Sequence, residues 1–190
     1  AQAVTTEPAP SGGVGYGGPQ RPDLSNTSYL IDALMELDAS GDDEAIQRAI
    51  AFVGRCQNLD SNYNDTKFGK LVDDGGFYYV IPTENVDPST DERYTANGGL
   101  RSYGSMSYAG FKSLIYAGLT EKDPRVKAVT EWLGKNYSVT ENPGVGDAGL
   151  YYYYNSFAAA LAAAKLDALV DDVGQSHDWR ADLAAELAIA

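Results

Sequence analysis

The sequence predicts an all-α fold built from tandem helical hairpins. Apolar residues recur at helical spacing on both sides of short polar breaks, and the chain matches itself when it is shifted by 80 residues without a gap. The shift keeps chemistry and spacing at these pairs: Leu34 with Leu114, Asp43 with Asp123, Ile46 with Val126, Phe52 with Trp132, and Arg55 with Lys135. A unit of this kind cannot bury its apolar stripe alone, so neighbouring copies are expected to stack.

The first hairpin is expected to follow a Pro/Gly-rich N-terminal arm over residues 1–22. Several capping residues then precede a helical series that ends at the polar break 40–43, and the partner helix is expected over about 44–57. This hairpin opens a repeat domain that we expect to span 23–190 and to be incomplete at its C-terminal end, because the last predicted helix has no partner.

The pattern changes over residues 59–97, between the first two hairpins. Glycines and aromatic residues replace the helical spacing, and residues 73–82 indicate a short aromatic strand or extended arm. We therefore expect one long aromatic loop or short β arm here. A long excursion between hairpins often carries function or a partner contact.

The second hairpin is expected to begin after the turn Gly98-Gly99. Its partner helix has Pro124 in the first turn, where the missing N–H costs nothing. An alanine-rich helix is expected from Leu150 to about Leu169, because alanine has the highest helix propensity. A further helix is expected to begin near Ser176.

Composition and charge narrow the function classes. The 190 residues are 44% hydrophobic, which suits one domain with a core. The 14 basic against 27 acidic residues give a net charge of −13, which repels nucleic acid, so no nucleic-acid partner is expected. No run approaches the roughly 20 apolar residues of a membrane span. The small, Pro-rich opening slightly favours export, periplasmic or extracellular, over a cytoplasmic location, although an internal linker would look the same.

Several motifs resemble the prenyltransferase and squalene-cyclase repeat superfamily, above all its bacterial repeat proteins of unassigned activity. These motifs are the glycine–aromatic turns at 75–77 and 98–99, the segment 103–109, Asp-Pro-Arg-Val at 123–126, and 149–154. The resemblance covers roughly residues 11–190. It implies an α/α toroid, present as a partial ring, whose central cavity lies at the N-terminal ends of the inner helices. Missing repeats or another chain would complete the ring.

The catalytic groups of that superfamily are not found at the matching positions. The resemblance would place the zinc-binding Asp and Cys of prenyltransferases near Ser105 and Ser107, and their His near Tyr154 or Asn155; none of these is a usual zinc ligand. No metal or other cofactor is therefore expected. The single cysteine, Cys56, lies in an apolar series and is expected to be a buried small hydrophobe.

Cyclases of the superfamily use an Asp-x-Asp-Asp acid. The nearest stretch here is Leu71-Val72-Asp73-Asp74, in which Leu71 replaces the first aspartate. Asp73 and Asp74 remain the catalytic candidates of a terpenoid or lipid cyclase-type enzyme. That hypothesis requires them to face a dry cavity with a raised pKa, whereas a solvated loop is the alternative.

Tyrosines gather at the expected starts of the inner helices, and a tyrosine offers a flat apolar face and one hydroxyl to a ligand. The candidate binding residues are Tyr103, Tyr108, Tyr151, Tyr152, Tyr153 and Tyr154. Four consecutive tyrosines point round a helix, so some are expected to pack between repeats instead. The leading hypothesis is a module that binds an apolar or sugar-like small molecule, or a protein partner, at this concave end. The alternatives are the cyclase-type enzyme and a structural assembly subunit.

Overall fold

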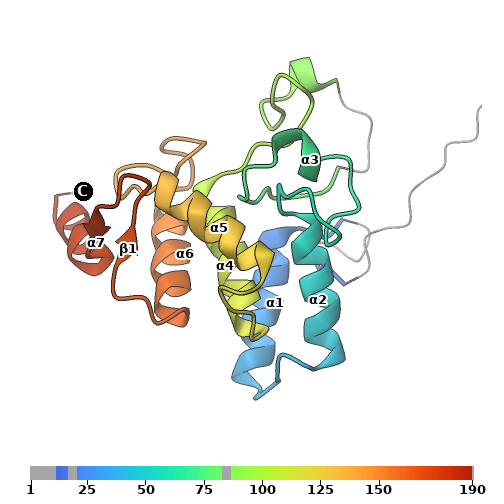
Figure 1. The fold of residues 1–190 in the computed structure, drawn as a ribbon, viewed down its shortest axis with the longest axis horizontal. Coiled ribbons are helices and arrows are strands. Elements are labelled where there is room, and N and C mark those ends of the chain that lie inside the picture. Colours follow the sequence, from blue (N-terminus) through green and yellow to red (C-terminus); the bar gives the residue numbers. More distant parts are fainter. Residues whose placement is uncertain (1–11, 17–20, 83–86, 190) are drawn as a thin grey trace, which may run out of the picture.

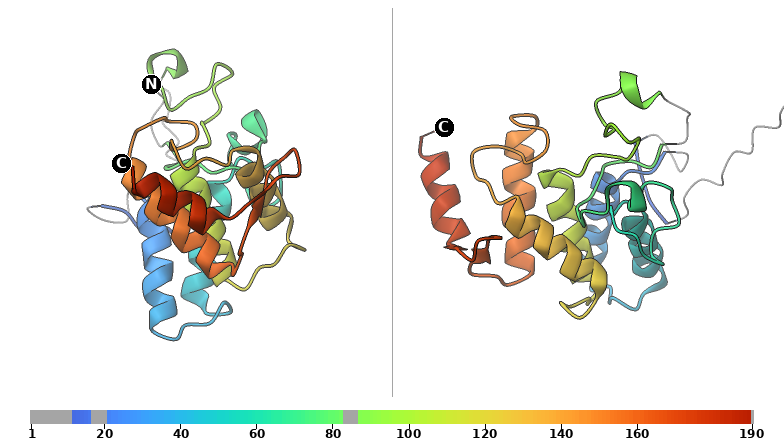
Figure 2. Two further views of the ribbon diagram at one scale, coloured as in Figure 1. Left: turned by 90° about the vertical axis from the view of Figure 1, so that its left-hand side faces the viewer. Right: turned by 45° about the horizontal axis from the view of Figure 1, so that its top comes forward.

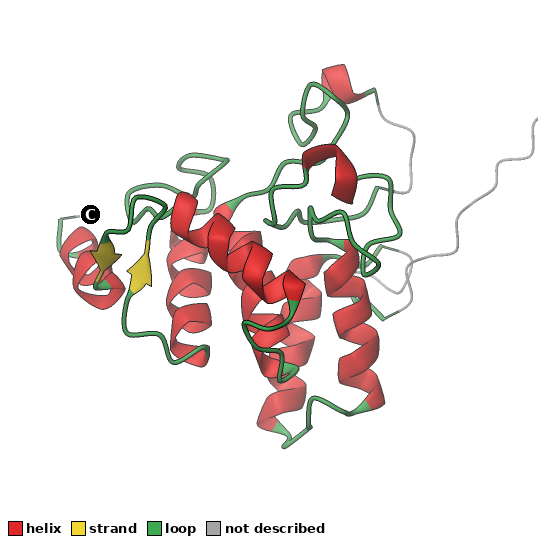
Figure 3. Cartoon of the chain, in the orientation of Figure 1, coloured by secondary structure: helices red, strands yellow, loops and turns green. Residues whose placement is uncertain are grey.

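Helices dominate the computed structural model, which describes residues 12–16, 21–82 and 87–189 (Figures 1 and 3). A two-stranded sheet is the only regular β-structure in these ranges, which confirms the all-α class in its broad form. The elements in chain order are α1 (Leu24–Glu36), α2 (Glu44–Arg55), α3 (Gly69–Val72), η1 (Pro88–Thr90), α4 (Gly104–Tyr116), α5 (Pro124–Lys135), α6 (Leu150–Ala163), β1 (Leu169–Val170), β2 (Ser176–His177) and α7 (Trp179–Leu187).

The helix bounds coincide with the self-match of the sequence. Helices α1 and α4 are both 13 residues long, and α2 and α5 are both 12. Leu24 and Gly104 begin the two longer helices, and Glu44 and Pro124 begin the two shorter ones, so the starts of each pair lie 80 residues apart. The chain thus contains two helix–turn–helix units with the same element lengths.

Aspartate side chains begin one helix in each unit. The carboxylate of Asp23 accepts a hydrogen bond from the backbone N–H of Asn26 at 2.8 Å, and that of Asp123 accepts from the N–H of Arg125 at 2.9 Å. These bonds satisfy N–H groups that have no partner within the helix. Hydrogen bonds from the Arg125 side chain hold the pKa of Asp123 below its ordinary value, so this cap remains charged at neutral pH.

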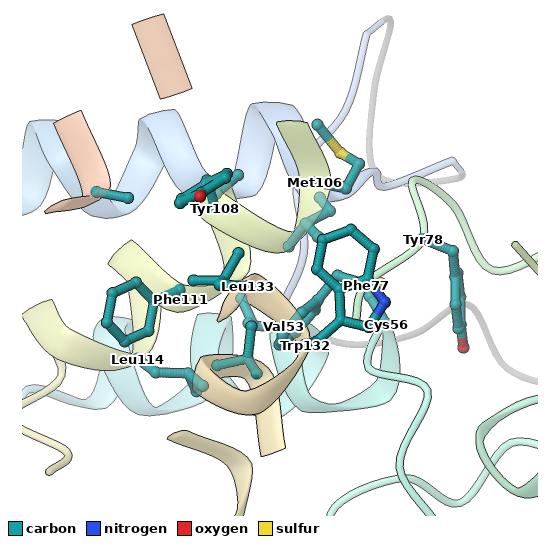
Figure 4. Packing of buried hydrophobic residues seen from close by; sticks show 14 of the residues in the cluster. Val53, Cys56, Phe77, Tyr78, Met106, Tyr108, Phe111, Leu114, Trp132 and Leu133 are labelled. Carbon is teal, nitrogen blue, oxygen red and sulfur yellow. The ribbon is translucent and has the colours of Figure 1, made fainter. Parts of the chain in front are cut away.

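Helix α4 lies at the centre and contacts α1, α2, α5 and α6 (Figures 1 and 2). Every residue from Gly104 to Leu114 is buried. A Cβ atom on Gly110 would lie 2.7 Å from the ring of Phe77, so the absence of a side chain lets that ring pack against the helix. The core around α4 draws on both units and on the loop between them (Figure 4); its labelled members are Val53, Cys56, Phe77, Tyr78, Met106, Tyr108, Phe111, Leu114, Trp132 and Leu133.

Helices α1, α4 and α6 run parallel. Lys112 of α4 donates to Asp32 of α1 at 2.6 Å, and both residues are ninth in their helices. The hydroxyl oxygens of Ser25 and Tyr152 lie 2.8 Å apart, which joins the first turns of α1 and α6. The N-terminal ends of the three helices therefore meet on the same side of the molecule.

The segment between α2 and α4 is a long loop that contains the short elements α3 and η1. The strand or arm predicted near residues 73–82 is present only as extended chain with one isolated β-bridge, between Gln57 and Phe77. Buried amides hold the loop in place. The Nδ2 of Asn58 donates to the carbonyl of Leu100 at 2.7 Å and to the hydroxyl of Ser102 at 2.8 Å. These bonds join the two ends of the loop without a continuous β-ladder.

The alanine-rich helix α6 is shorter than predicted. It ends at Ala163 rather than near Leu169, because Lys165 adopts a left-handed conformation with φ 54° and the chain turns away. Strands β1 and β2 follow, and Leu169 pairs with His177 in an antiparallel register. The sequence pattern did not predict this hairpin.

Part of the predicted N-terminal arm lies against α1. The backbone N–H of Val14 donates to the Thr27 hydroxyl at 3.1 Å, and the N–H of Asp23 donates to the Val14 carbonyl at 3.0 Å. Residues 1–11 and 17–20 of the arm lie outside the described residues. Among the helices that are described, none combines the length and the apolar character needed to cross a membrane.

Candidate functional site

A cavity of about 850 Å³ lies where the N-terminal ends of α1, α4 and α6 meet. Each helix contributes from its first turn: Ser25 from α1, Met106 from α4 and Tyr152 from α6. Loops close the remaining sides. The lining residues are Tyr16, Ser25, Tyr78, Tyr79, Val80, Glu92, Arg93, Leu100, Arg101, Tyr103, Ser105, Met106, Asn142, Gly144, Val145, Gly146, Ala148, Gly149 and Tyr152.

The helix ends at the cavity differ in how they are capped. The carboxylate of Asp23 caps α1, and the Oδ1 of Asn142 accepts from the backbone N–H of Ser105 at 3.0 Å in the first turn of α4. Gly149 precedes α6 with φ 64° and has no side chain to cap it. Because backbone N–H groups make the start of a helix electropositive, the N-terminal end of α6 adds a positive field to its surroundings.

Two of the six predicted tyrosines line the cavity. Tyr103 lies immediately before α4, and Tyr152 lies in the first turn of α6 with its hydroxyl bonded to Ser25. Burial is the main cause that raises the pKa of both hydroxyls. Like ordinary tyrosines, both are protonated at neutral pH and can donate a hydrogen bond.

The other four tyrosines do not line the cavity. Tyr108 and Tyr153 are 1% and 0% exposed, and their rings pack in the core with centroids 5.8 Å apart. The hydroxyl of Tyr154 donates to the carbonyl of Val139 at 2.8 Å, on the side of the loop before α6. Tyr151 is 70% exposed. Successive residues of a helix point about 100° apart, so only Tyr152 of the four consecutive tyrosines lines the cavity.

Sequence reasoning missed three tyrosines that do line it: Tyr16, Tyr78 and Tyr79. They come from the N-terminal arm and from the aromatic loop, which pack beside the helix ends. Burial, and then the negative charge of Asp23, raise the pKa of Tyr79 to about 12. The signal was available as glycine-flanked aromatics, such as Gly75-Gly76 before Phe77, but their meeting point depends on long-range packing.

The candidate acids Asp73 and Asp74 are exposed and do not line the cavity. Asp74 accepts hydrogen bonds from the Ser102 hydroxyl at 2.7 Å, from the Gly76 N–H at 3.0 Å and from the Trp132 ring N–H at 3.2 Å. Asp73 accepts from the backbone N–H of Asp60 at 2.8 Å. The dry cavity that the cyclase hypothesis required is thus absent around them, and Asp74 instead ties the aromatic loop to α5.

Charged side chains line the loop side of the cavity. Arg93 is paired with Asp91, with Nε 2.9 Å from Oδ1. Arg101 is exposed and has no ion-pair partner in the described part of the chain, and Glu92 is the one carboxylate among the described lining residues. Two arginines and one carboxylate thus line the described part of the cavity, and Asp91, outside the lining, pairs with one of the arginines.

The two remaining chemically reactive residues lie elsewhere. Cys56 is fully buried, as predicted, and burial raises the pKa of its thiol well above the ordinary value. His177 stacks on Tyr137 with ring centroids 4.1 Å apart and contacts Asp171 at 3.0 Å, beside α7. Within the described ranges, no three His, Cys, Asp or Glu side chains are arranged to hold a metal ion.

Comparison with known proteins identifies no relative. No family model, no curated protein and no solved structure matches the chain. The geometry and chemistry of the cavity are therefore the basis on which its function can be inferred.

Proposed function

We propose that this chain is a ligand-binding module of the α/α-toroid type, forming part of a ring, that holds a small molecule in the cavity at the N-terminal ends of α1, α4 and α6. Two helix–turn–helix units of equal element lengths support the repeat architecture. In the superfamily that the sequence resembles, the cavity lies at this end of the inner helices. The resemblance therefore implies a cavity at the same end of the helices as the one in this chain.

The observation that carries the proposal is the cavity itself. Its volume of about 850 Å³ lies within the range of roughly 300–1,000 Å³ that small-molecule sites occupy. Five tyrosines are among the described residues that line it: Tyr16, Tyr78, Tyr79, Tyr103 and Tyr152. Aromatic walls with a few convergent polar groups are typical of sites that bind ring-shaped or elongated ligands.

A catalytic role has less support. Ser105 lines the cavity but carries a hydroxyl where the prenyltransferases have a metal ligand. Ser107 is buried, and its hydroxyl accepts from the backbone N–H of Phe77 at 3.0 Å. Tyr154 is bonded to Val139, and Asn155 is exposed. These four positions therefore carry no metal ligand of the kind that the prenyltransferases use.

The proposal is tested by a ligand-detected NMR screen of the purified chain with ring compounds and apolar chains, neutral and charged. We expect compounds that bind the wild type to be released by Tyr103→Ala and retained by Tyr151→Ala, because Tyr151 is exposed outside the cavity. Circular dichroism serves as the control that both variants are folded. An empty screen, or hits that both variants retain equally, would overturn the proposal.

An assembly role is the second candidate, and one observation favours it. Exposed apolar side chains collect in the last part of the chain, where Val170 is 58%, Val173 82% and Leu187 48% exposed. Singly exposed apolar residues are ordinary, so this candidate requires these side chains to form one contiguous surface. Sedimentation over a range of concentrations tests this candidate: a mass that stays at one chain throughout would argue against it.

A further inference from the structure

We propose that the cavity takes a ring compound that carries a carboxylate, either an aromatic acid or an acidic sugar. This inference rests on the proposed function and narrows it to one class of ligand. It follows from the hydrogen-bond donors in the wall, from an arginine of the wall, Arg101, and from the flat faces of the tyrosine side chains.

The wall offers hydrogen-bond donors to a ligand. The hydroxyl of Tyr103, which lines the cavity, is protonated at neutral pH like that of any tyrosine and can donate. The amide of Asn142 is already used: its Oδ1 accepts from Ser105, and its Nδ2 donates to the carbonyl of Ala148 at 3.0 Å and to the Ser105 hydroxyl at 3.3 Å. A ligand rich in acceptor oxygens complements such a wall.

The charged side chains in the described lining are Arg93, Arg101 and Glu92. Arg93 is paired with Asp91, which lies outside the lining, whereas Arg101 has no ion-pair partner within the described residues. A guanidinium binds a carboxylate through two parallel N–H···O bonds, which are among the stronger hydrogen bonds in proteins. We therefore assign Arg101 as the residue that binds the carboxylate.

The first turn of α6 adds to this preference. Gly149 and Tyr152 line the cavity, and no side chain caps the helix. The positive end of the helix dipole therefore reinforces Arg101 on the same cavity. A purely apolar chain fits less well, because it would displace water from the tyrosine hydroxyls and from Arg101 without replacing the hydrogen bonds of that water.

The tyrosines account for the ring. Tyr79, Tyr103 and Tyr152 all line this cavity. Their side chains present flat faces that stack on an aromatic ring or on the apolar face of a sugar. The wall does not distinguish these two rings, so the experiment includes one arm for each.

The test is isothermal titration calorimetry of the full chain with two matched pairs, benzoate against benzamide and digalacturonate against the neutral galactose disaccharide. We expect the acid of one pair to bind at least about tenfold more tightly than its neutral partner, equivalent to about 1.4 kcal/mol. The pair that shows the difference identifies the ring. The preference should shrink as salt is added, because exposed charges are screened.

Variants locate the effect. Arg101→Gln should remove most of the preference for the acid, and Arg101→Lys should retain part of it. Arg180→Gln is the matched control, because Arg180 is an exposed arginine of α7 that lies outside the lining and contacts Asp167 at 3.4 Å. Its preference for the acid should equal that of the wild type.

The outcomes separate this inference from the proposed function. If acids and neutral partners bind equally and Tyr103→Ala releases both, the carboxylate inference is overturned and the binding function stands. If Arg101→Gln keeps the preference, the assignment of Arg101 is overturned. If none of these compounds binds, the inference fails; if the wider screen is empty as well, the proposed function fails with it.

Discussion

Lys112 donates a hydrogen bond to Asp32 at 2.6 Å, and the two residues occupy equivalent positions, 80 residues apart, in the parallel helices α4 and α1. The Lys112 side chain is 10% exposed and that of Asp32 is 29% exposed. The second carboxylate oxygen of Asp32 is buried without a hydrogen-bond partner in the described part of the chain. The pair therefore fixes the lengthwise position of α1 against α4, and with it the alignment of their N-terminal ends at the cavity.

Removing this pair should destabilise the protein. Lys112→Met leaves a largely buried carboxylate unpaired, and we expect the free energy of unfolding to fall by about 2 kcal/mol in chemical denaturation. The control is Arg48→Met, which breaks the exposed pair with Glu44 and should cost less than about 0.5 kcal/mol. Equal losses in the two variants would show that the buried pair does not hold the helices.

Asp74 should prove structural. Asp74→Ala removes the acceptor of three hydrogen bonds, which come from Ser102, Trp132 and Gly76. The bonds from Ser102 and Trp132 join the aromatic loop to its neighbours. Because the carboxylate is solvent-exposed, we expect a moderate loss of about 1–2 kcal/mol in the free energy of unfolding. The neighbouring Asp73→Asn retains an acceptor for Asp60 and tolerates the left-handed backbone, so it should change stability by less than about 0.5 kcal/mol. An unaffected Asp74→Ala would refute this role.

Stability should decline in alkaline solution. Burial and the charge of Asp23 raise the pKa of Tyr79 from 10.0 to about 12, and burial raises the pKa of Tyr103 and Tyr153. The folded state therefore holds these protons more tightly than the unfolded state. Their contribution is complete below about pH 10 and is lost as the pH rises through the folded pKa, from about 10 to about 12 for Tyr79.

The measurement is the denaturation midpoint across this range, combined with the ultraviolet absorbance of tyrosinate. We expect the midpoint to fall steadily above about pH 10, and to fall less steeply in Tyr79→Phe, which lacks one of the groups. A midpoint that stays constant while the buried tyrosines ionise would contradict the expected linkage.

Cys56 should be unreactive until the chain unfolds. Its side chain is fully buried and its pKa is raised by burial, so neither the thiolate nor access is available in the native state. A thiol reagent should modify it at the rate of unfolding, faster as denaturant is added. Cys56→Ser should cost more stability than Cys56→Ala, because it buries a hydroxyl in an apolar site. Rapid modification in native buffer would contradict this placement.

Local patterns predicted the helices well because their causes lie close together in the sequence. Capping aspartates, Pro124 and the apolar spacing set the starts of α1, α2, α4 and α5 within a few residues. The end of α6 was misplaced because alanine propensity continues past Ala163, while the backbone conformation of Lys165 ends the helix. The β1–β2 hairpin was missed because each strand has two residues, too few to show alternation.

The cavity was harder to predict than the helices. Tyr103 and Tyr152 were identified because they lie at helix starts, but Tyr108 and Tyr153, which are also tyrosines near these starts, belong to the core. Rotation about the helix axis separates them, and a sequence does not reveal which face a neighbouring helix will cover. Arg101 depends on the packing of the loop before α4, so no local pattern indicated it.

The central claim is that small molecules bind where α1, α4 and α6 begin. Backbone amide NMR spectra, recorded while the compounds that bind in the ligand screen are titrated into the full chain, test it most directly. We predict shifts concentrated at Ser25, Ser105, Gly149 and Tyr152, which line the cavity. Shifts that are absent, or confined to β1 and α7 at the far end of the chain, would contradict the claim.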